Sequence, residues 1–246
     1  MNYKTQLSSL VLASFLLFSC ESFIPITGAM GQGTSSTTYT PTSGEINSGL
    51  KEALVKATGI SADKLNAKDG YLGNLDVKIL FPEEAQNIEK TLRSIGLGSM
   101  VDQVITSVNR AAEDAAVAAK PIFTDAIKQM SIADVKNILL GNKNAATTYF
   151  NTTTSPALTE RFSPIIDSSL KKTDATKYWE DVMVRYNKVP FVKKVDTDLT
   201  AYVTKKAIDG LFIEIAKEEL KIRESISERT SPLLKKVFGF AQQEGK

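Results

Sequence analysis

The sequence has no histidine, and its only cysteine is Cys20. Without histidine the chain cannot form a Ser-His-Asp triad or a Cys-His pair, which excludes common forms of nucleophilic catalysis. Histidine and cysteine are also leading zinc ligands, and a single cysteine cannot form an intramolecular disulfide. An enzyme built on this chain would have to use carboxylates, lysine, tyrosine, serine or arginine. We therefore expect a protein that is not an enzyme and that binds no metal and no cofactor.

The chain also lacks an excess of charge of one sign. It has 30 lysine and arginine residues against 28 aspartate and glutamate residues, a net charge of +2. A nucleic-acid-binding protein would show a strong basic excess, so no nucleic-acid partner is expected. No segment after the N-terminal leader has the run of about 20 apolar residues that a transmembrane helix needs.

The position of Cys20 is the most informative feature that is present. Lys4 precedes an apolar segment over residues 7–18, and Ser19-Cys20 follows directly. The apolar segment is too short to cross a bilayer, and a basic start before such a segment is typical of an export signal. The arrangement resembles a bacterial lipoprotein signal, with residues 1–19 as signal peptide and Cys20 as the acylated first residue. An ordinary secretory signal with an incidental cysteine is the alternative.

The residues after Cys20 indicate where the protein is held. Two or more acyl chains, such as palmitate, give stable membrane anchoring. Glu21 is not followed by an acidic run of the kind that directs some lipoproteins to the outer cell surface. We therefore expect the protein in the bacterial cell envelope, on the periplasmic side of the outer membrane. Residues 20–43 are rich in glycine, serine and threonine and are expected to form a flexible tether.

The rest of the chain shows the periodicity of helices. We predict a single all-α domain over residues 44–240, a bundle of about 8–10 helices, and a short tail at 241–246. One short extended piece is predicted near 76–81. The apolar residues of 99–119 recur at three- and four-residue steps, as in an amphipathic helix. The helix at 198–224 is apolar on nearly all sides at its centre, which is typical of a helix inside a bundle.

Local signals predict several helix ends. Ser131 and Asp134 resemble a capping box. Pro156 is expected to begin a new helix, and Gly239 is expected to end the last one. Aromatic residues, Phe191 among them, are expected in the core.

Several segments of the sequence match a known family. The matching strings are GLKEAL at 49–54, NRAAE at 109–113, DAIKQM at 125–130, AATTYF at 145–150, YVTKKAIDGLF at 202–212, Glu218-Glu219 with Arg223, and LKKVFG at 234–239. Together they resemble the bacterial family called domain of unknown function 4197, over residues 45–239. The resemblance implies a helical protein of the bacterial envelope, often with a signal or lipoprotein leader. It implies no activity and no catalytic residues.

Six polar residues in otherwise apolar helices are the candidate site. They could line a pocket, or they could be buried pairs that fix how helices dock, since buried charges are kept when they are paired. The structural interpretation is the one we favour. The six are Asn109, Arg110, Glu113, Asp209, Glu219 and Arg223.

Three functions remain open from the sequence, and the least favoured is an enzyme, which requires a cleft where Asn109, Arg110, Glu113 or Glu219 converge. The first is a non-enzymatic interaction or scaffold protein of the envelope, which requires an exposed apolar patch. The second is a carrier of a lipid or another small apolar ligand, which requires an enclosed apolar cavity of several hundred Å³. The expected partners are the membrane, through the anchor at Cys20, and either an envelope protein or such a ligand.

Overall fold

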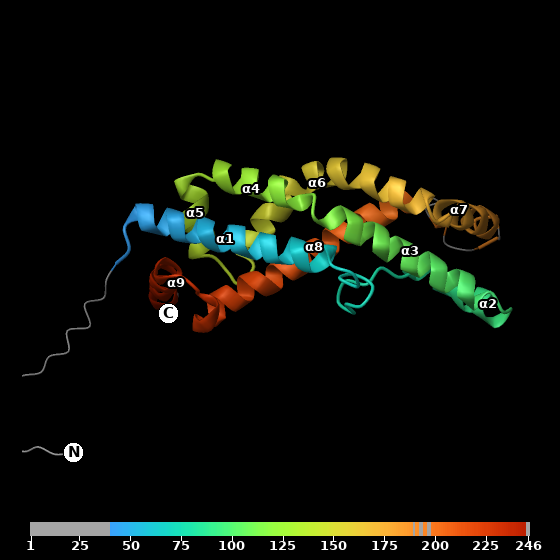
Figure 1. Cartoon of the computed structure of the whole chain (residues 1–246), viewed down its shortest axis with the longest axis horizontal. Coiled ribbons are helices and arrows are strands. Elements are labelled where there is room, and N and C mark those ends of the chain that lie inside the picture. The colour runs from blue at the N-terminus through green and yellow to red at the C-terminus, as the bar shows by residue number, and fades with distance from the viewer. Residues whose placement is uncertain (1–39, 189, 192–193, 196–197, 245–246) are drawn as a thin grey trace, which may run out of the picture. The chain divides into compact units, whose positions relative to one another are not determined.

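The structure is a computed structural model that describes residues 40–188, 190–191, 194–195 and 198–244. Within that part of the chain the backbone forms nine α-helices, two short 3-10 helices and no strand (Figure 1). The elements in chain order are α1 (Ser43–Asn66), η1 (Glu83–Ala85), α2 (Gln86–Ser94), α3 (Gly98–Ala116), α4 (Ala119–Gln129), α5 (Ile132–Leu139), α6 (Ala145–Lys171), α7 (Ala175–Tyr186), α8 (Leu199–Glu224), η2 (Ile226–Glu228) and α9 (Pro232–Glu244). The predicted all-α, multi-helix fold is confirmed.

The helical part begins at Thr42, which caps α1. Its hydroxyl accepts a hydrogen bond from the Glu45 N–H, and the Glu45 carboxylate accepts one from the Thr42 N–H in return. This capping box satisfies two backbone donors that a helix start leaves free. The predicted signal peptide, Cys20 and the predicted tether up to residue 39 lie outside the described residues.

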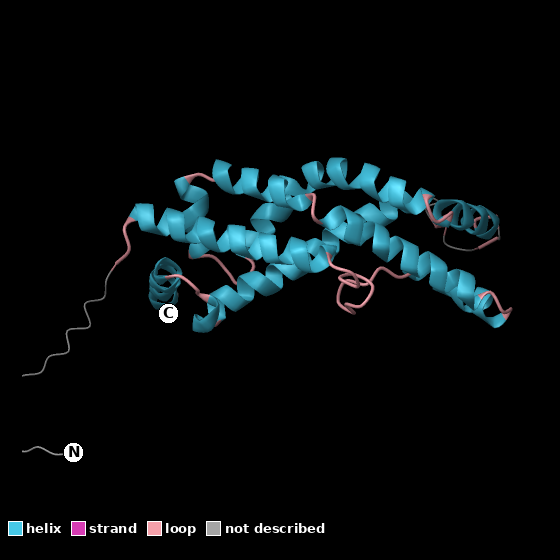
Figure 2. Ribbon diagram, in the orientation of Figure 1, coloured by secondary structure: helices cyan, strands magenta, loops and turns pink. Residues whose placement is uncertain are grey.

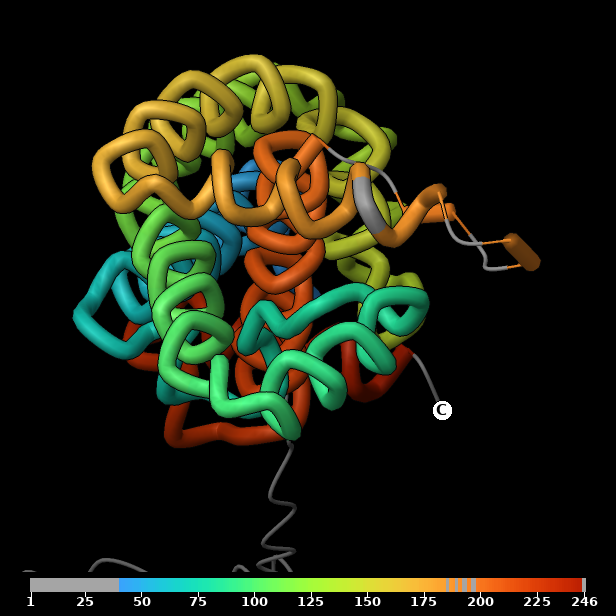
Figure 3. The backbone as a smooth tube through the Cα atoms, turned by 90° about the vertical axis from the view of Figure 1, so that its right-hand side faces the viewer, coloured from blue at the N-terminus to red at the C-terminus, as the bar shows by residue number. Residues whose placement is uncertain are grey.

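Helix α8 runs through the middle of the bundle, as its apolar centre predicts. Figure 3 looks along it, with α6 at the top and α3 at the left, and these two helices also pack against each other. It packs against α1, α3, α6 and α7, and Leu211 and Ile215 are fully enclosed there. None of the described helices combines the length and apolar character of a bilayer-crossing segment.

Helix α3 is amphipathic as predicted, although it ends earlier than expected. Its alanines 111, 112, 115 and 116 are fully buried, and such small side chains let neighbouring helices approach closely. The helix stops at Ala116, and α4 starts at Ala119. Pro121 lies in the first turn of α4, where its missing N–H has no intrahelical partner to lose.

The prediction that Pro156 begins a new helix is wrong, because α6 is one continuous helix with Pro156 and Pro164 inside it. Both prolines are exposed, and so are Thr152 and Glu160, four residues earlier. The carbonyls that the prolines leave without a helical N–H therefore lie on the solvent side, where water can pair them. The buried residues of α6 fall at every fourth position: Ala146, Phe150, Thr154, Leu158, Phe162, Ile166 and Leu170.

Three further predictions are corrected. Gly239 does not end α9, which runs on to Glu244 and takes in most of the predicted tail. Phe191 is fully exposed, because it lies in the turn after α7 and not in a helix. The segment 76–81 forms no strand and belongs to an irregular connection, residues 67–82, which we call the 67–82 loop (Figure 2).

A pair of glycine-to-alanine variants tests how tightly this loop packs on α8. At Gly210 an added Cβ would lie 2.8 Å from Cε1 of Tyr71 and 3.1 Å from Cβ of Val77, both buried. At Gly59 it would meet nothing within 4 Å. Gly210→Ala should therefore lower the free energy of unfolding by about 1–3 kcal/mol. Gly59→Ala should raise it by up to about 1 kcal/mol.

Urea unfolding of both variants measures these effects. Because both substitutions add one methyl group inside a helix, helix propensity acts equally on the two. Equal changes in the free energy of unfolding would contradict close packing of the 67–82 loop on α8.

Candidate functional site

Glu113 of α3 holds the beginning of the 67–82 loop. Its Oε1 accepts hydrogen bonds from the backbone N–H groups of Tyr71 and Leu72, each at 3.1 Å. Its Oε2 pairs with Nη1 of Arg110 at 2.5 Å, and Nη2 of Arg110 reaches Asp69 at 2.7 Å. The carboxylate is almost fully buried. A charge in that position is stable because both of its oxygens are satisfied.

Asn109, one helical turn before Glu113 in α3, holds the end of the same loop. Its Oδ1 accepts the Ile79 N–H at 2.8 Å, and its Nδ2 donates to the Ile79 carbonyl at 2.8 Å. A second donation goes to the Ile105 carbonyl within α3, at 2.7 Å. The amide thus supplies Ile79 with the two hydrogen bonds that a neighbouring strand would otherwise make. The backbone of Ile79 is therefore fully paired although the segment forms no sheet.

Residues of α8 also form hydrogen bonds with the 67–82 loop. The Tyr71 hydroxyl donates to the Ala207 carbonyl at 2.7 Å, and burial raises the pKa of this tyrosine. Glu214 accepts from Lys64, Lys217 and the Asn74 side chain at 2.5–3.0 Å. Burial alone would raise the pKa of Glu214, but these hydrogen bonds outweigh it and lower the pKa to about 2. The acid is therefore a fixed charge at neutral pH.

Glu219 and Arg223 form a separate cluster that joins three helices. Glu219 accepts from the N–H groups of Ala146 and Thr147, which are free donors at the start of α6. Arg223 pairs with Glu219 at 2.8 Å and donates to the carbonyls of residues 138 and 139 at the end of α5. One ion pair of α8 thereby satisfies a helix start and a helix end.

The six predicted site residues therefore fall into three places. Asn109, Arg110 and Glu113 meet at the 67–82 loop, and Glu219 meets Arg223 at the α5–α6 junction. Asp209 lies apart from both and pairs with Lys205 on the surface of α8, at 2.6 Å. The residues do not converge on one cleft, and the contacts of the first five are those of helix and loop docking.

A mostly apolar surface feature lies elsewhere, among helices at the end of the bundle that faces the viewer in Figure 3. It is an open groove of about 580 Å³, which we call the α2–α3–α7 groove. Its walls are mostly apolar side chains from those three helices, with a few polar ones. The lining residues used below are Ile88, Leu92, Leu97, Met100, Tyr178 and Asp181.

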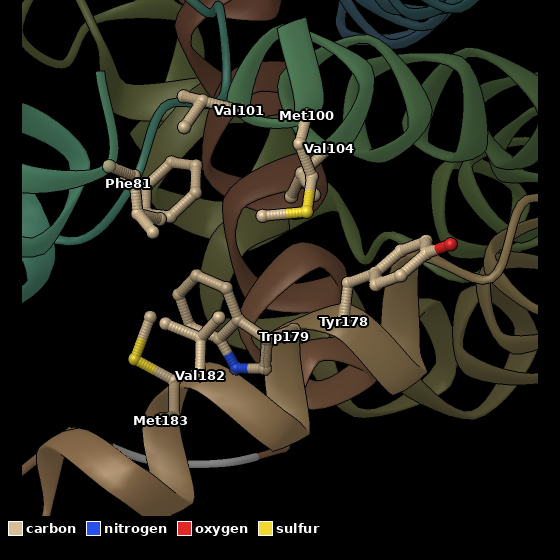
Figure 4. A pocket seen from close by; sticks show the side chains of 9 residues that line it. Phe81, Met100, Val101, Val104, Tyr178, Trp179, Val182 and Met183 are labelled. Carbon is tan, nitrogen blue, oxygen red and sulfur yellow. The ribbon is translucent and has the colours of Figure 1, made fainter. Parts of the chain in front are cut away.

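Beneath the groove lies a small apolar pocket that shares Leu92, Met100 and Tyr178 with it. In Figure 4 Phe81 faces Trp179 across this pocket, and Met100 points in from above. The Phe81 and Trp179 ring centroids are 5.3 Å apart. The pocket has a volume of about 10 Å³, room for a single water molecule.

The groove exists because the apolar side of α2 is covered only in part. Ile88, Leu92 and Ile95 follow one another at helical spacing, yet no residue of α2 is fully buried. Ile95 and Leu97, at the turn into α3, are 64% and 40% exposed. The sequence carried this signal as an amphipathic stripe in 82–95. Because α2 packs mainly on α3 and η1, only the structure shows that part of the stripe stays open.

Comparison with known proteins gives one result. The model of a family described as protein of unknown function (DUF4197) matches residues 40–239. No curated protein and no solved structure matches the chain.

Two adjacent glutamates of α8, Glu218 and Glu219, allow a matched test of the Glu219–Arg223 cluster at the α5–α6 junction. Glu219→Ala removes the cap of α6 and leaves the guanidinium of Arg223 buried without its carboxylate. We expect the free energy of unfolding to fall by about 3–5 kcal/mol. Glu218→Ala breaks only a pair with Lys221, whose side chain is 53% exposed, and should cost about 1 kcal/mol or less.

Chemical unfolding followed by circular dichroism measures both variants. Their helix propensities change equally, so the difference reports the buried joint. Similar losses for the two variants would show that Glu219 and Arg223 do not hold the helices together.

Proposed function

We propose that this chain, which belongs to the DUF4197 family of proteins of unknown function, is a non-enzymatic binding module of the bacterial envelope. Its binding site is the α2–α3–α7 groove. The observation that carries the proposal is the exposure of a continuous apolar surface on an otherwise well-packed bundle. Large exposed apolar patches in folded proteins mark sites of interaction.

The ion pairs of the buried glutamates support a role without catalysis. Each buried glutamate of α3 and α8 is neutralised by a lysine or arginine: Glu113, Glu214, Glu218 and Glu219. A catalytic acid or base needs a reactive group facing a cleft that can hold a substrate. These carboxylates instead bind backbone N–H groups and neighbouring cations, and none of them lines the groove.

The open form of the groove favours an interaction module over a carrier. A small ligand in its site loses about 70–90% of its surface to the protein. The pocket beneath the groove has room for one water molecule, and the larger volume above it opens to solvent. A carrier requires an enclosed cavity of several hundred Å³. The pocket that Phe81 and Trp179 line together has a volume of only about 10 Å³.

Membrane attachment through Cys20 is the second part of the proposal. It is supported by the leader pattern over residues 1–20 and by the lack of any other cysteine. The described chain enters the bundle at α1, and the groove lies at the far end, beyond α3 (Figure 1). An anchor before α1 would leave that end free to meet a partner on the periplasmic side.

The anchor is tested by substitution in a bacterial host that processes lipoproteins. Cys20→Ala should move the protein from the membrane fraction to the soluble fraction, because the acyl chains are attached through the cysteine sulfur. Ser22→Ala, two residues on, should leave it in the membrane fraction. Fractionation and the intact mass of the N-terminal peptide are the measurements. Membrane retention of Cys20→Ala equal to that of the natural sequence would contradict lipid anchoring.

The groove is tested with Nile red, an uncharged dye that fluoresces in apolar surroundings. Leu97 is the N-cap residue of α3, and Ile132 is the first residue of α5 at the other end of the bundle. Leu97→Asp and Ile132→Asp each put a carboxylate at a helix start, where the charge is favourable for stability. We expect the first to reduce dye binding severalfold and the second to leave it unchanged.

Circular dichroism of both variants checks that the fold is kept. Equal dye binding by the natural sequence and both variants would show that the groove is no binding surface, and the proposal would fail.

A further inference from the structure

We infer that the occupant of the α2–α3–α7 groove is a basic amphipathic helix of a partner protein, with Asp181 facing a lysine or arginine of that helix. The inference rests on the proposed function and names the chemistry of the ligand. It is carried by the charge in the groove and by the form of the groove.

Among the residues with described side chains, Asp181 is the one charged residue that lines the groove. It makes no ion pair or hydrogen bond with any residue that the structure describes. The nearby acids Glu89 and Asp102 differ from it, since both pair with Arg93. Among the described side chains, a carboxylate beside apolar walls is thus the charge that an occupant of the groove would meet.

That carboxylate selects among apolar ligands. A fatty acid or an anionic phospholipid would bring a second negative charge next to Asp181, and like charges in contact weaken binding. A lysine or arginine on an apolar segment would instead gain a pair there. Charge complementarity of this kind sets which partner binds more than it sets the total affinity.

The groove has apolar walls on two sides that an amphipathic helix could contact. Ile88 and Leu92, one helical turn apart on α2, line one wall, and Tyr178 of α7 lines the other, 43% exposed. Met100 lies between them, and methionine adapts its shape to different partners. A helix placed in an open groove inserts side chains at positions i, i+3, i+4 and i+7 while its polar face stays in water. An open groove fits such a ligand because only one face has to be covered.

Two synthetic helical peptides test the inference. Each has about 15–20 residues, the same leucine face and no tryptophan, and the flanking positions are lysine in one and glutamate in the other. Trp179 is the only tryptophan of the chain and lines the pocket beneath the groove. Its emission therefore reports binding. We expect the lysine peptide to bind roughly three- to tenfold more tightly at physiological salt.

Two charge reversals on α7 give the matched control. Asp181 lines the groove, and Glu180 is exposed but does not line it. Asp181→Lys and Glu180→Lys change the net charge of the protein by the same amount. Only Asp181→Lys should remove the preference for the lysine peptide. Because the chain has a net charge of +2, unspecific attraction would favour the glutamate peptide in every variant.

The remaining outcomes overturn the inference in distinguishable ways. Equal affinity for both peptides, or equal effects of the two reversals, would show that Asp181 selects nothing. Binding of palmitate or of phosphatidylglycerol vesicles without binding of either peptide would overturn the inference and favour the lipid carrier over the interaction module, with the groove still the binding site. A dimer in sedimentation that Leu97→Asp dissociates would assign the groove to a second copy of the chain. Binding of no probe at all, with Nile red unaffected by Leu97→Asp, would overturn the proposed function as well.

Discussion

The hydrogen bonds from Glu113 and Asn109 to the backbone of the 67–82 loop are the constraint on which the rest of the structure depends. The loop has no helical or sheet partner for its buried N–H groups, and such groups cannot remain unsatisfied. Two side chains of α3 supply those partners at residues 71, 72 and 79. The loop can therefore cross the bundle while staying irregular.

The hydrogen bonds that hold the loop also position Phe81, which lies next to the groove. Two residues beyond the Asn109 contact, Phe81 packs on Trp179 and becomes part of the pocket beneath the groove. Trp179 in turn stacks on Tyr202 of α8, whose hydroxyl bonds the Leu80 carbonyl. Polar contacts made deep in the bundle thus set the floor of an apolar surface at its end.

Buried charge in this protein is used to connect helices. Glu219 and Arg223 satisfy the ends of α5 and α6. Arg229, 2% exposed, donates to the carbonyls of Ile222 and Arg223 at the end of α8. Burial lowers the pKa of Arg229, and the carbonyl contacts replace part of the water it has lost. The connections at the ends of α5, α6 and α8 are stabilised in this way.

The sequence predicted correctly those features that depend on residues close together in the chain, such as helix caps and apolar helix faces. Ser131 and Asp134 form the expected capping box, with both hydrogen bonds present, and the apolar centre of α8 is buried as expected. The predictions that failed concern helix ends. Pro156 lies inside α6 because the carbonyl that it leaves unpaired faces water. Gly239 lies inside α9, which continues to Glu244. The groove could not be predicted, since the stripe of α2 looks the same whether it is covered or open.

The four-residue spacing of the buried positions in α6 has a consequence for motion. Four residues turn a helix by about 400°, so the buried stripe winds around α6 by roughly 40° at each step. Successive stretches therefore face different neighbours, and α6 packs against α3, α4, α5, α7 and α8. A helix held from several directions cannot slide or roll without breaking all of these contacts together. Helix α2 packs mainly on α3 and η1, so of the three helices around the groove it has the fewest partners.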